Sequence, residues 1–278
     1  MTTNKIVRPF LKWAGGKRQL LPEIKNYVPK NYKTYYEPFL GGGAILFNLQ
    51  PKKATINDSN PELINCYEVI RDSVDELIED LKKHQNTESY YYEMRELDRT
   101  TTYKNNYDKV KRASRILYLN KTCYNGLFRV NSQGQFNVPF GKYKNPNILD
   151  EAVLRAVNKY LNQNQVKILN DDFEKAVLDV KKGDFVYFDP PYDPVSQTAS
   201  FTGYDVNGFD RNEQERLKNV FDDLTSRGCK ALLSNADTDF ILELYSSYKI
   251  ERILATRAIN SNALKRGKIS EVLVRNYE

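Results

Sequence analysis

The sequence predicts an α/β fold in which a mostly helical segment interrupts one sheet. Short apolar strand candidates alternate with helical segments in residues 1–58 and again in residues 166–278, whereas helical periodicity dominates residues 59–165. One sheet with an inserted domain is the simplest arrangement that accounts for this order. We therefore expect one α/β domain formed by residues 1–58 and 166–278, and an inserted domain formed by residues 59–165.

Each element rests on a local pattern. Short apolar, β-branched and aromatic runs predict strands over residues 35–37, 54–57, 166–169, 185–188, 231–234, 250–254 and 272–275. Apolar residues at helical spacing predict helices over residues 17–27, 42–49, 62–85, 90–99, 107–122, 150–161, 211–226 and 239–245. Residues 124–146 are rich in Asn, Gly and Pro, which predicts an irregular loop or hairpin.

The composition is 40% hydrophobic and 28% charged, as in ordinary soluble globular proteins. Cys66, Cys123 and Cys229 lack any metal-binding spacing, which predicts reduced thiols in the cytoplasm. The single histidine, His84, lies in a polar run and is predicted to face solvent; one histidine argues against a zinc site and a Ser-His-Asp triad. The N-terminal residues contain no long apolar segment, so neither a signal peptide nor membrane association is expected.

Positive charge is concentrated in the middle of the chain. The net charge is +6, but residues 81–145 contain 13 Lys or Arg against 5 Asp or Glu, which is +8 and leaves −2 for the rest. Tyrosines are interleaved with these charges. This pattern indicates a polyanionic partner such as nucleic acid, or else a solvated helical surface. Charge alone leaves both interpretations open.

The strand predicted at residues 185–188 runs directly into Asp189, Pro190, Pro191 and Tyr192. Because Asp and Pro commonly end strands, a simple turn accounts for this sequence. A carboxylate and a tyrosine presented at the end of a buried strand could also form a site. These four residues do not decide between the two interpretations.

The stretch "EPFLGGGA", residues 37–44, follows the first predicted strand and opens a helix. Its glycines allow a sharp turn and a close approach to the backbone. It lacks the third glycine of GxGxxG, since Leu46 stands there, and it is not a P-loop. Asp58, at the end of the second strand, could accept hydrogen bonds from ribose hydroxyls. Together these features favour a nucleoside ligand whose phosphates are dispensable.

The N-terminal stretch "FLKWAGGKRQLL" contains the only tryptophan, Trp13, between two lysines. One interpretation is a helix cap with a buried Trp. In the other, Trp13 walls a cofactor pocket and Lys17 holds a carboxylate of the ligand.

Several of these motifs, in order, resemble those of Dam-type DNA N6-adenine methyltransferases of the D12 class, and the DpnII-like members above all. The matching stretches are FLKWAGGKRQLL, EPFLGGGA, IND, YNGLFRVN, DDF, DPPY and RGKISE, which cover nearly the whole chain. The resemblance implies a Rossmann-like methyltransferase sheet with an inserted, mostly helical DNA-recognition domain. It implies S-adenosylmethionine as methyl donor, S-adenosylhomocysteine as product and no metal. The acceptor would be a flipped adenine in double-stranded DNA, within GATC, in the cytoplasm of a bacterium or a phage host, with no obligate protein partner.

The resemblance also implies roles for individual residues. Asp189 and the carbonyl of Pro190 would accept the two hydrogens of the adenine amine, and Tyr192 would stack on the flipped base. The cofactor would be bound by Trp13, Lys17, Phe39, Gly41, Gly43, Asp58, Asp172, Phe173 and Asp189. DNA would be bound by Lys12, Tyr124, Asn125, Leu127, Arg129 and Pro139. Arg129 suits a bidentate contact to guanine and Leu127 a thymine methyl; Phe128 and Val130 receive no role.

Two alternatives remain at this point. The same acceptor groups would serve N6-adenine methylation of RNA or N4-cytosine methylation. A DNA-binding protein that keeps the fold without activity is the other, and the intact DPPY motif argues against it. The sequence does not decide whether the protein belongs to a restriction-modification system, acts alone or is phage-encoded.

Overall fold

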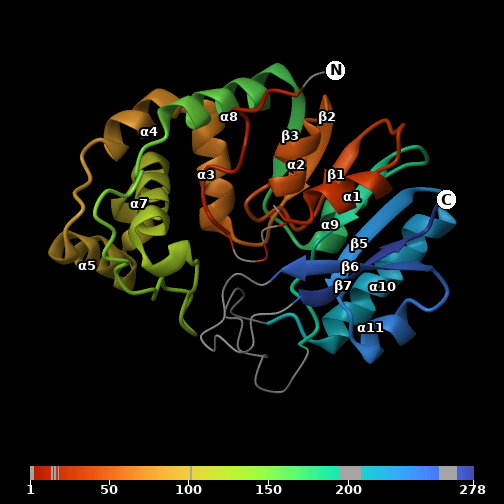
Figure 1. Ribbon diagram of the computed structural model, residues 1–278. Coiled ribbons are helices and arrows are strands. Elements are labelled where there is room, and N and C mark those ends of the chain that lie inside the picture. The colour runs from red at the N-terminus through yellow and green to blue at the C-terminus, as the bar shows by residue number, and fades with distance from the viewer. Residues whose placement is uncertain are drawn as a thin grey trace.

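A computed structural model describes residues 3–13, 15, 17, 19–100, 102–194, 208–256 and 268–278. Ala14, Gly16 and Arg18 of the N-terminal motif, and Arg266 and Gly267 of RGKISE, lie outside this part. The described residues form one seven-stranded sheet with a helical block beside it (Figure 1). The strands are β1 (Tyr35–Glu37), β2 (Lys53–Asn57), β3 (Gln165–Leu169), β4 (Phe185–Phe188), β5 (Lys230–Ala236), β6 (Lys249–Thr256) and β7 (Lys268–Arg275).

The strand order is β3-β2-β1-β4-β5-β7-β6. β7 runs antiparallel to its neighbours β5 and β6, and the other paired strands are parallel. Strands from both ends of the sequence therefore share one sheet, since β1 pairs with both β2 and β4. The predicted Rossmann-like α/β sheet, interrupted by a helical segment, is confirmed.

Helices cover both faces of this sheet, and β4 shows how. Phe185 and Tyr187 pack into one core with α1 (Leu21–Tyr27) and α2 (Ala44–Leu49). Val186 and Phe188 point the other way, into a second core with α9 (Phe173–Ala176), α10 (Arg211–Ser226) and α11 (Asp239–Leu244). Because successive side chains of a strand point to opposite faces, an interior strand must be apolar throughout. This accounts for the uninterrupted apolar run at residues 185–188.

The chain between β2 and β3 is mostly helical. It contains α3 (Pro61–Asp72), α4 (Val74–Leu81), α5 (Glu88–Glu96), η1 (Leu97–Arg99), α6 (Tyr103–Asn106), α7 (Lys109–Thr122), η2 (Tyr124–Gly126) and α8 (Glu151–Gln163). The single helix predicted over residues 62–85 is two helices, because Ser73 has non-helical φ −144° and ψ 44°. Buried residues keep the same spacing on both sides of Ser73, so periodicity alone does not reveal the break.

The prediction that His84 faces solvent is wrong. Its two ring nitrogens lie 2.9 Å from Tyr90 Oη and 2.9 Å from Ser114 Oγ, and its ring stacks on Tyr118 at 4.4 Å. Burial lowers the pKa of His84 to about 4, so the imidazole is neutral at physiological pH. Ser114 and Tyr118 belong to another helix, and no local pattern in the polar run indicates them. Elsewhere among the described residues, each helix is too short or too polar to cross a lipid bilayer.

Candidate active site

The predicted site residues gather at the edge of the sheet where parallel strands end. The glycine turn follows β1, Asp58 follows β2, and Asp189 follows β4 directly. The carboxyl ends of neighbouring parallel strands meet at one edge, which is where ligands bind in open α/β sheets. The topology therefore brings together residues as far apart in the sequence as Gly41 and Asp189, which are 148 positions apart.

A compact charged group surrounds Asp189. Lys17 Nζ lies 3.0 Å from Asp189 Oδ1, 3.7 Å from Glu271 Oε2 and 4.2 Å from the centre of the Tyr192 ring. Lys17 is 5% exposed. Burial raises the pKa of Asp189 to about 6, although Lys17 opposes this rise. Asp189 is thus ionised at neutral pH and protonated in mild acid. The sequence predicts that Lys17 holds a carboxylate of the ligand; here its ammonium binds carboxylates of the chain itself.

Glu271, on β7, is a site residue that the sequence analysis missed. Its Oε2 accepts a hydrogen bond of 2.8 Å from the Tyr192 hydroxyl. Glu271 is the last residue of the RGKISE motif, but a glutamate on a strand gives no local sign that its partner, Tyr192, lies 79 positions away in the sequence. Tyr192 is consequently held from two sides, by Glu271 at its hydroxyl and by Lys17 at its ring.

Two buried amide side chains, those of Gln214 and Asn235, hold the backbone next to the Pro190–Pro191 segment by hydrogen bonds. Gln214 Nε2 donates to the Pro191 carbonyl at 2.8 Å, and Gln214 Oε1 accepts from Asn235 Nδ2 at 3.0 Å. Asn235 Oδ1 in turn accepts from the backbone N–H of Asp193 at 3.2 Å. Both amide side chains are fully buried, so their hydrogen bonds are costly to break. This network fixes the backbone that follows Asp189.

Asp58 is joined to the glycine turn. Its Oδ2 accepts from the Gly41 N–H at 2.9 Å and its Oδ1 from the Asn60 N–H at 2.9 Å. Gly41 has φ +49°, and a Cβ there would lie 2.8 Å from Trp13 Cδ1. The turn therefore needs glycine partly because Trp13 lies over it. A carboxylate held in this way can still accept hydrogen bonds from a diol through its remaining lone pairs.

Aromatic rings lie beside this carboxylate edge. Phe39 stacks on Phe173 with ring centres 5.2 Å apart, and Phe209, which the sequence analysis did not single out, meets Phe39 edge-on at 5.6 Å. Asp172 caps α9 and binds Arg216 through two contacts of 2.8 Å. Arg216 thereby holds the pKa of Asp172 below its usual range. A flat base and a ribose diol fit this combination of aromatic rings and acceptors.

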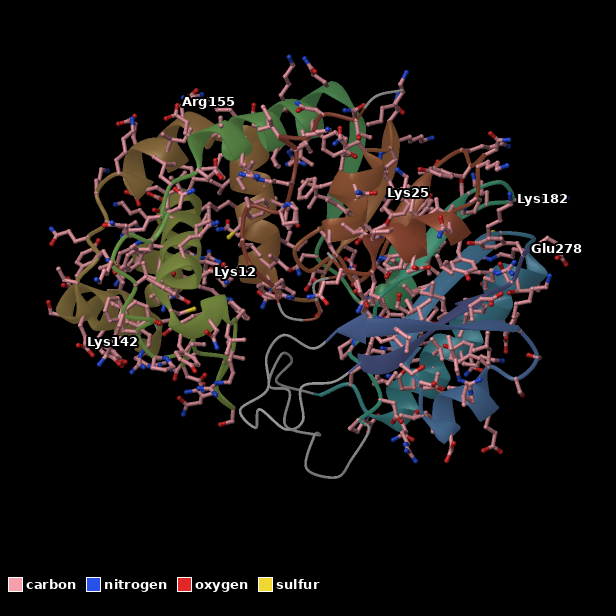
Figure 2. The ribbon with its side chains drawn as sticks, viewed as in Figure 1. Lys12, Lys25, Lys142, Arg155, Lys182 and Glu278 are labelled. Carbon is pink, nitrogen blue, oxygen red and sulfur yellow. The ribbon has the colours of Figure 1, made fainter. Side chains whose placement is uncertain are left out.

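The predicted DNA contacts fall on the junction between helical block and sheet. Lys12 is clamped there: its N–H donates to Asn120 Oδ1 at 2.8 Å, and Asn120 Nδ2 donates to its carbonyl at 2.7 Å. Figure 2 shows Lys12 between the two parts of the molecule. The N–H of Tyr124 donates to the Pro139 carbonyl at 2.8 Å, and the Tyr124 side chain is 54% exposed. Asn125, with φ +56°, turns the chain beside them.

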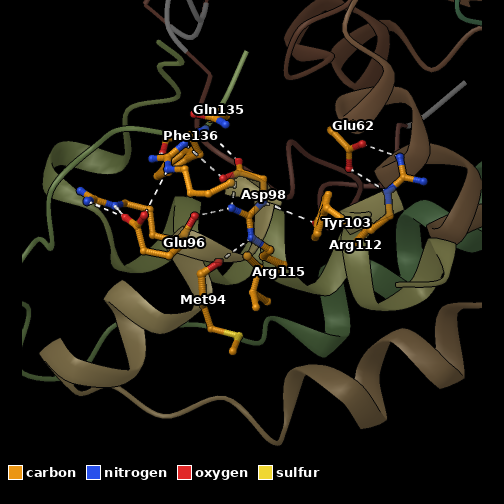
Figure 3. A network of polar contacts seen from close by, with 12 residues as sticks. Glu62, Met94, Glu96, Asp98, Tyr103, Arg112, Arg115, Gln135 and Phe136 are labelled. Atoms are coloured by element: carbon orange, nitrogen blue, oxygen red, sulfur yellow. Dashed lines mark hydrogen bonds and ion pairs between the residues drawn. The ribbon is translucent and has the colours of Figure 1, made fainter. Parts of the chain in front are cut away.

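Arg129 lies farther out, on an arm formed by residues 127–140. Its Nε donates to Asn137 Oδ1 at 2.8 Å, and its side chain is exposed. The arm is anchored next to its turn, where Phe136 lies opposite Val130. The Phe136 N–H donates to Asp98 at 2.9 Å, and Asp98 lies 3.0 Å from the buried Arg115 guanidinium (Figure 3). The arm is thus held to the helical block while Arg129 remains accessible.

Phe128, which received no role from sequence, connects the arm to the glycine turn. It is 3% exposed and stacks on Trp13 at 4.4 Å with an interplanar angle of 25°. The Phe128 and Phe136 rings meet edge to face, with centres 5.7 Å apart. Leu127, beside it, is half-buried. Trp13 therefore contacts both the glycine turn and the arm that carries Arg129.

Known proteins resemble this chain over most of its length. Residues 13–259 match the family model of the D12 class N6 adenine-specific DNA methyltransferase. The type II methyltransferase M1.LlaDCHI of Lactococcus lactis subsp. cremoris is 49% identical over 99% of this chain and 97% of its own. The type II methyltransferase M.MjaIII of Methanocaldococcus jannaschii is 45% identical over 98% and 99%. A DNA adenine methylase of Haemophilus influenzae is 36% identical over 96% and 92%.

Proposed function

The chain belongs to the D12 class of N6 adenine-specific DNA methyltransferases, and we propose that it methylates a flipped adenine in duplex DNA, within GATC, with S-adenosylmethionine as donor. The observation that carries this proposal is the half-buried group of Asp189, Lys17 and Tyr192 at the carboxyl end of β4. The GATC assignment rests on the resemblance of the motifs to DpnII-like enzymes.

The adenine amine is a poor nucleophile because its lone pair is delocalised into the ring. An ionised Asp189 accepts one of its hydrogens and draws the nitrogen towards a tetrahedral geometry. Gln214 already binds the Pro191 carbonyl, so we assign the second hydrogen to the carbonyl of Pro190. Tyr192, held by Glu271 and Lys17, offers its ring to the extruded base and offsets part of the cost of flipping.

The donor supplies an electrophilic methyl group, and residues of the chain form its binding site. Asp58 accepts from the ribose hydroxyls, and Phe39 and Phe173 lie along the base. Gly41 and Gly43 shape the turn over which Trp13 lies. Asp172, already bound to Arg216, lies at the edge of this aromatic group.

The helical segment, residues 59–165, is proposed as the target-recognition domain. Lys12, Tyr124, Asn125 and Pro139 form one accessible group at its junction with the sheet. Leu127 and Arg129 belong to the anchored arm. Arginine reads guanine through paired contacts in the major groove, and an exposed guanidinium on an anchored arm suits that role.

A plasmid methylation assay tests the proposal. DNA treated with the protein and donor should resist a GATC enzyme blocked by adenine methylation and be cut by one that requires it. Asp189→Asn should lower the rate by at least about a hundredfold, whereas Asp179→Asn, on an exposed carboxylate, serves as the matched control. Labelled methyl groups found in RNA, or on cytosine, would overturn the assignment.

A further inference from the structure

The charged group around Asp189 holds more negative than positive charge. Asp189 and Glu271 are two carboxylates, and among the residues that the structure describes Lys17 is the ammonium that lies between them, at 3.0 and 3.7 Å. The side chains of Asp189 and Glu271 are 19% and 17% exposed. With both carboxylates ionised, this half-buried group carries one net negative charge.

Other described groups that face Glu271 leave this balance unchanged. Its register partners on the neighbouring strands, Ala236 and Ile253, are uncharged. Tyr187 and Tyr192 are neutral phenols whose pKa values burial raises well above the usual range. Burial raises the pKa of Glu37 to about 8, with a smaller rise from the charge of Asp189, so Glu37 is mostly protonated at neutral pH.

The proposed reaction changes the charge of the ligand by one unit. S-adenosylmethionine carries a sulfonium cation, and its product S-adenosylhomocysteine carries a neutral thioether; the rest of the two molecules is identical. The methyl group is delivered to the amine that Asp189 holds, so the sulfonium must come to this charged group. A residual negative charge there favours the donor and not the product.

We propose that Glu271 sets the ligand selectivity of the reaction centre: by making the group around Lys17 and Asp189 net negative, it binds the cationic donor in preference to the neutral product. This inference rests on the proposed function, because it assumes that donor. Lys17 alone would neutralise Asp189 and leave no such preference. Glu271 thus acts as a selectivity residue, and its hydrogen bond to Tyr192 is a separate contribution.

Calorimetry with two non-reacting ligands at about pH 7 measures this selectivity. Sinefungin has an amine in place of the methylated sulfonium and is cationic, whereas S-adenosylhomocysteine is neutral there. Glu271→Gln keeps a carbonyl oxygen for Tyr192 but removes the charge. This variant should raise the Kd of sinefungin about tenfold, which is the effect of one charge in a partly screened site. It should change the Kd of S-adenosylhomocysteine less than about twofold.

Two control variants separate charge from other effects. Tyr192→Phe removes the hydroxyl but keeps all three charges, so the ratio of the two Kd values should stay as in the wild type. Glu251→Gln removes a charge from the neighbouring strand β6, where Glu251 binds Arg275 at 3.0 Å, and should also leave the ratio unchanged. A change in the ratio for Tyr192→Phe as large as that for Glu271→Gln would assign the effect to the hydrogen bond and overturn the inference.

The remaining outcomes are equally decisive. Equal weakening of both ligands in Glu271→Gln would make Glu271 a structural residue, and an unchanged ratio would refute the selectivity. If Glu271→Gln does not fold, the wild-type protein provides the test. Protonation of Asp189 removes one negative charge, so the ratio of the two Kd values should shift against sinefungin between about pH 7 and about pH 5. A ratio that stays constant over this range refutes the inference. Wild-type protein that binds neither ligand would instead refute the proposed function itself.

Discussion

Replacing Phe128 with alanine should disturb both the arm of residues 127–140 and the glycine turn. The Phe128 ring is 3% exposed and contacts Trp13 at 4.4 Å and Phe136 at 5.7 Å. Phe128→Ala removes the ring from both contacts at once. Trp13 is then expected to lose its fixed position over Gly41, because the ring that stacks on it is gone.

Truncation of a buried phenylalanine to alanine costs about 3–5 kcal/mol of unfolding free energy. We expect about 3 kcal/mol here, since the irregular arm can close part of the space. Domains of this kind unfold with about 5–15 kcal/mol, so the variant should still fold. Part of the effect should appear locally, as a weaker Kd for S-adenosylhomocysteine, because Trp13 borders that site.

Tryptophan fluorescence checks the local effect directly, since Trp13 is the only tryptophan. Phe128→Ala should shift its emission to longer wavelength, while urea unfolding measures the loss of stability. Phe140→Ala is the matched control: Phe140 belongs to the same arm but packs on Tyr91 at 5.2 Å. Wild-type emission from folded Phe128→Ala protein, at an unchanged Kd, would refute the proposed contact between arm and turn.

Four further predictions concern single residues. Burial raises the pKa of Asp189 to about 6, so kcat/KM, which reports the free enzyme, should fall about tenfold per pH unit below that value as the carboxylate is protonated; a flat profile of kcat/KM down to about pH 5 would refute the requirement for an Asp189 that ionises near pH 6. Asp58→Ala should weaken S-adenosylhomocysteine by about 1–3 kcal/mol, and an unchanged calorimetric Kd would leave Asp58 as a turn residue only. Arg129→Ala should reduce discrimination at one guanine of the site by about 1–3 kcal/mol, measured as kcat/KM on duplexes with and without that guanine. An equal loss of kcat/KM on every duplex, with the dependence of binding on log[salt] weaker by about one, would mean a phosphate contact. Gln214→Leu should lower kcat and leave KM nearly unchanged, because the Pro191 carbonyl loses its hydrogen-bond donor. A raised KM at an unchanged kcat in steady-state kinetics would argue against a positioning role for Gln214.

Local patterns determined much of the architecture. The strand Phe185–Phe188 and the helix Arg211–Ser226 have the bounds predicted from sequence. The strand is apolar on both faces because it is interior, and the helix begins after Asp210, whose side chain caps it. These signals lie within a few residues of the element they define. Motif order likewise indicated the family before any contact between the motifs was known.

Tertiary structure alone decided which distant side chains meet. Ser73 divides a helix although the apolar spacing continues across it, and His84 lies between helices although its neighbours in sequence are polar. Glu271 reaches Tyr192 only because β7 enters the sheet antiparallel next to β5. Strand order and direction depend on how all the helices and strands pack around the common core, and no periodicity within a segment encodes them. The charge balance at Asp189, and the contact of Phe128 with Trp13, are consequences of that closure.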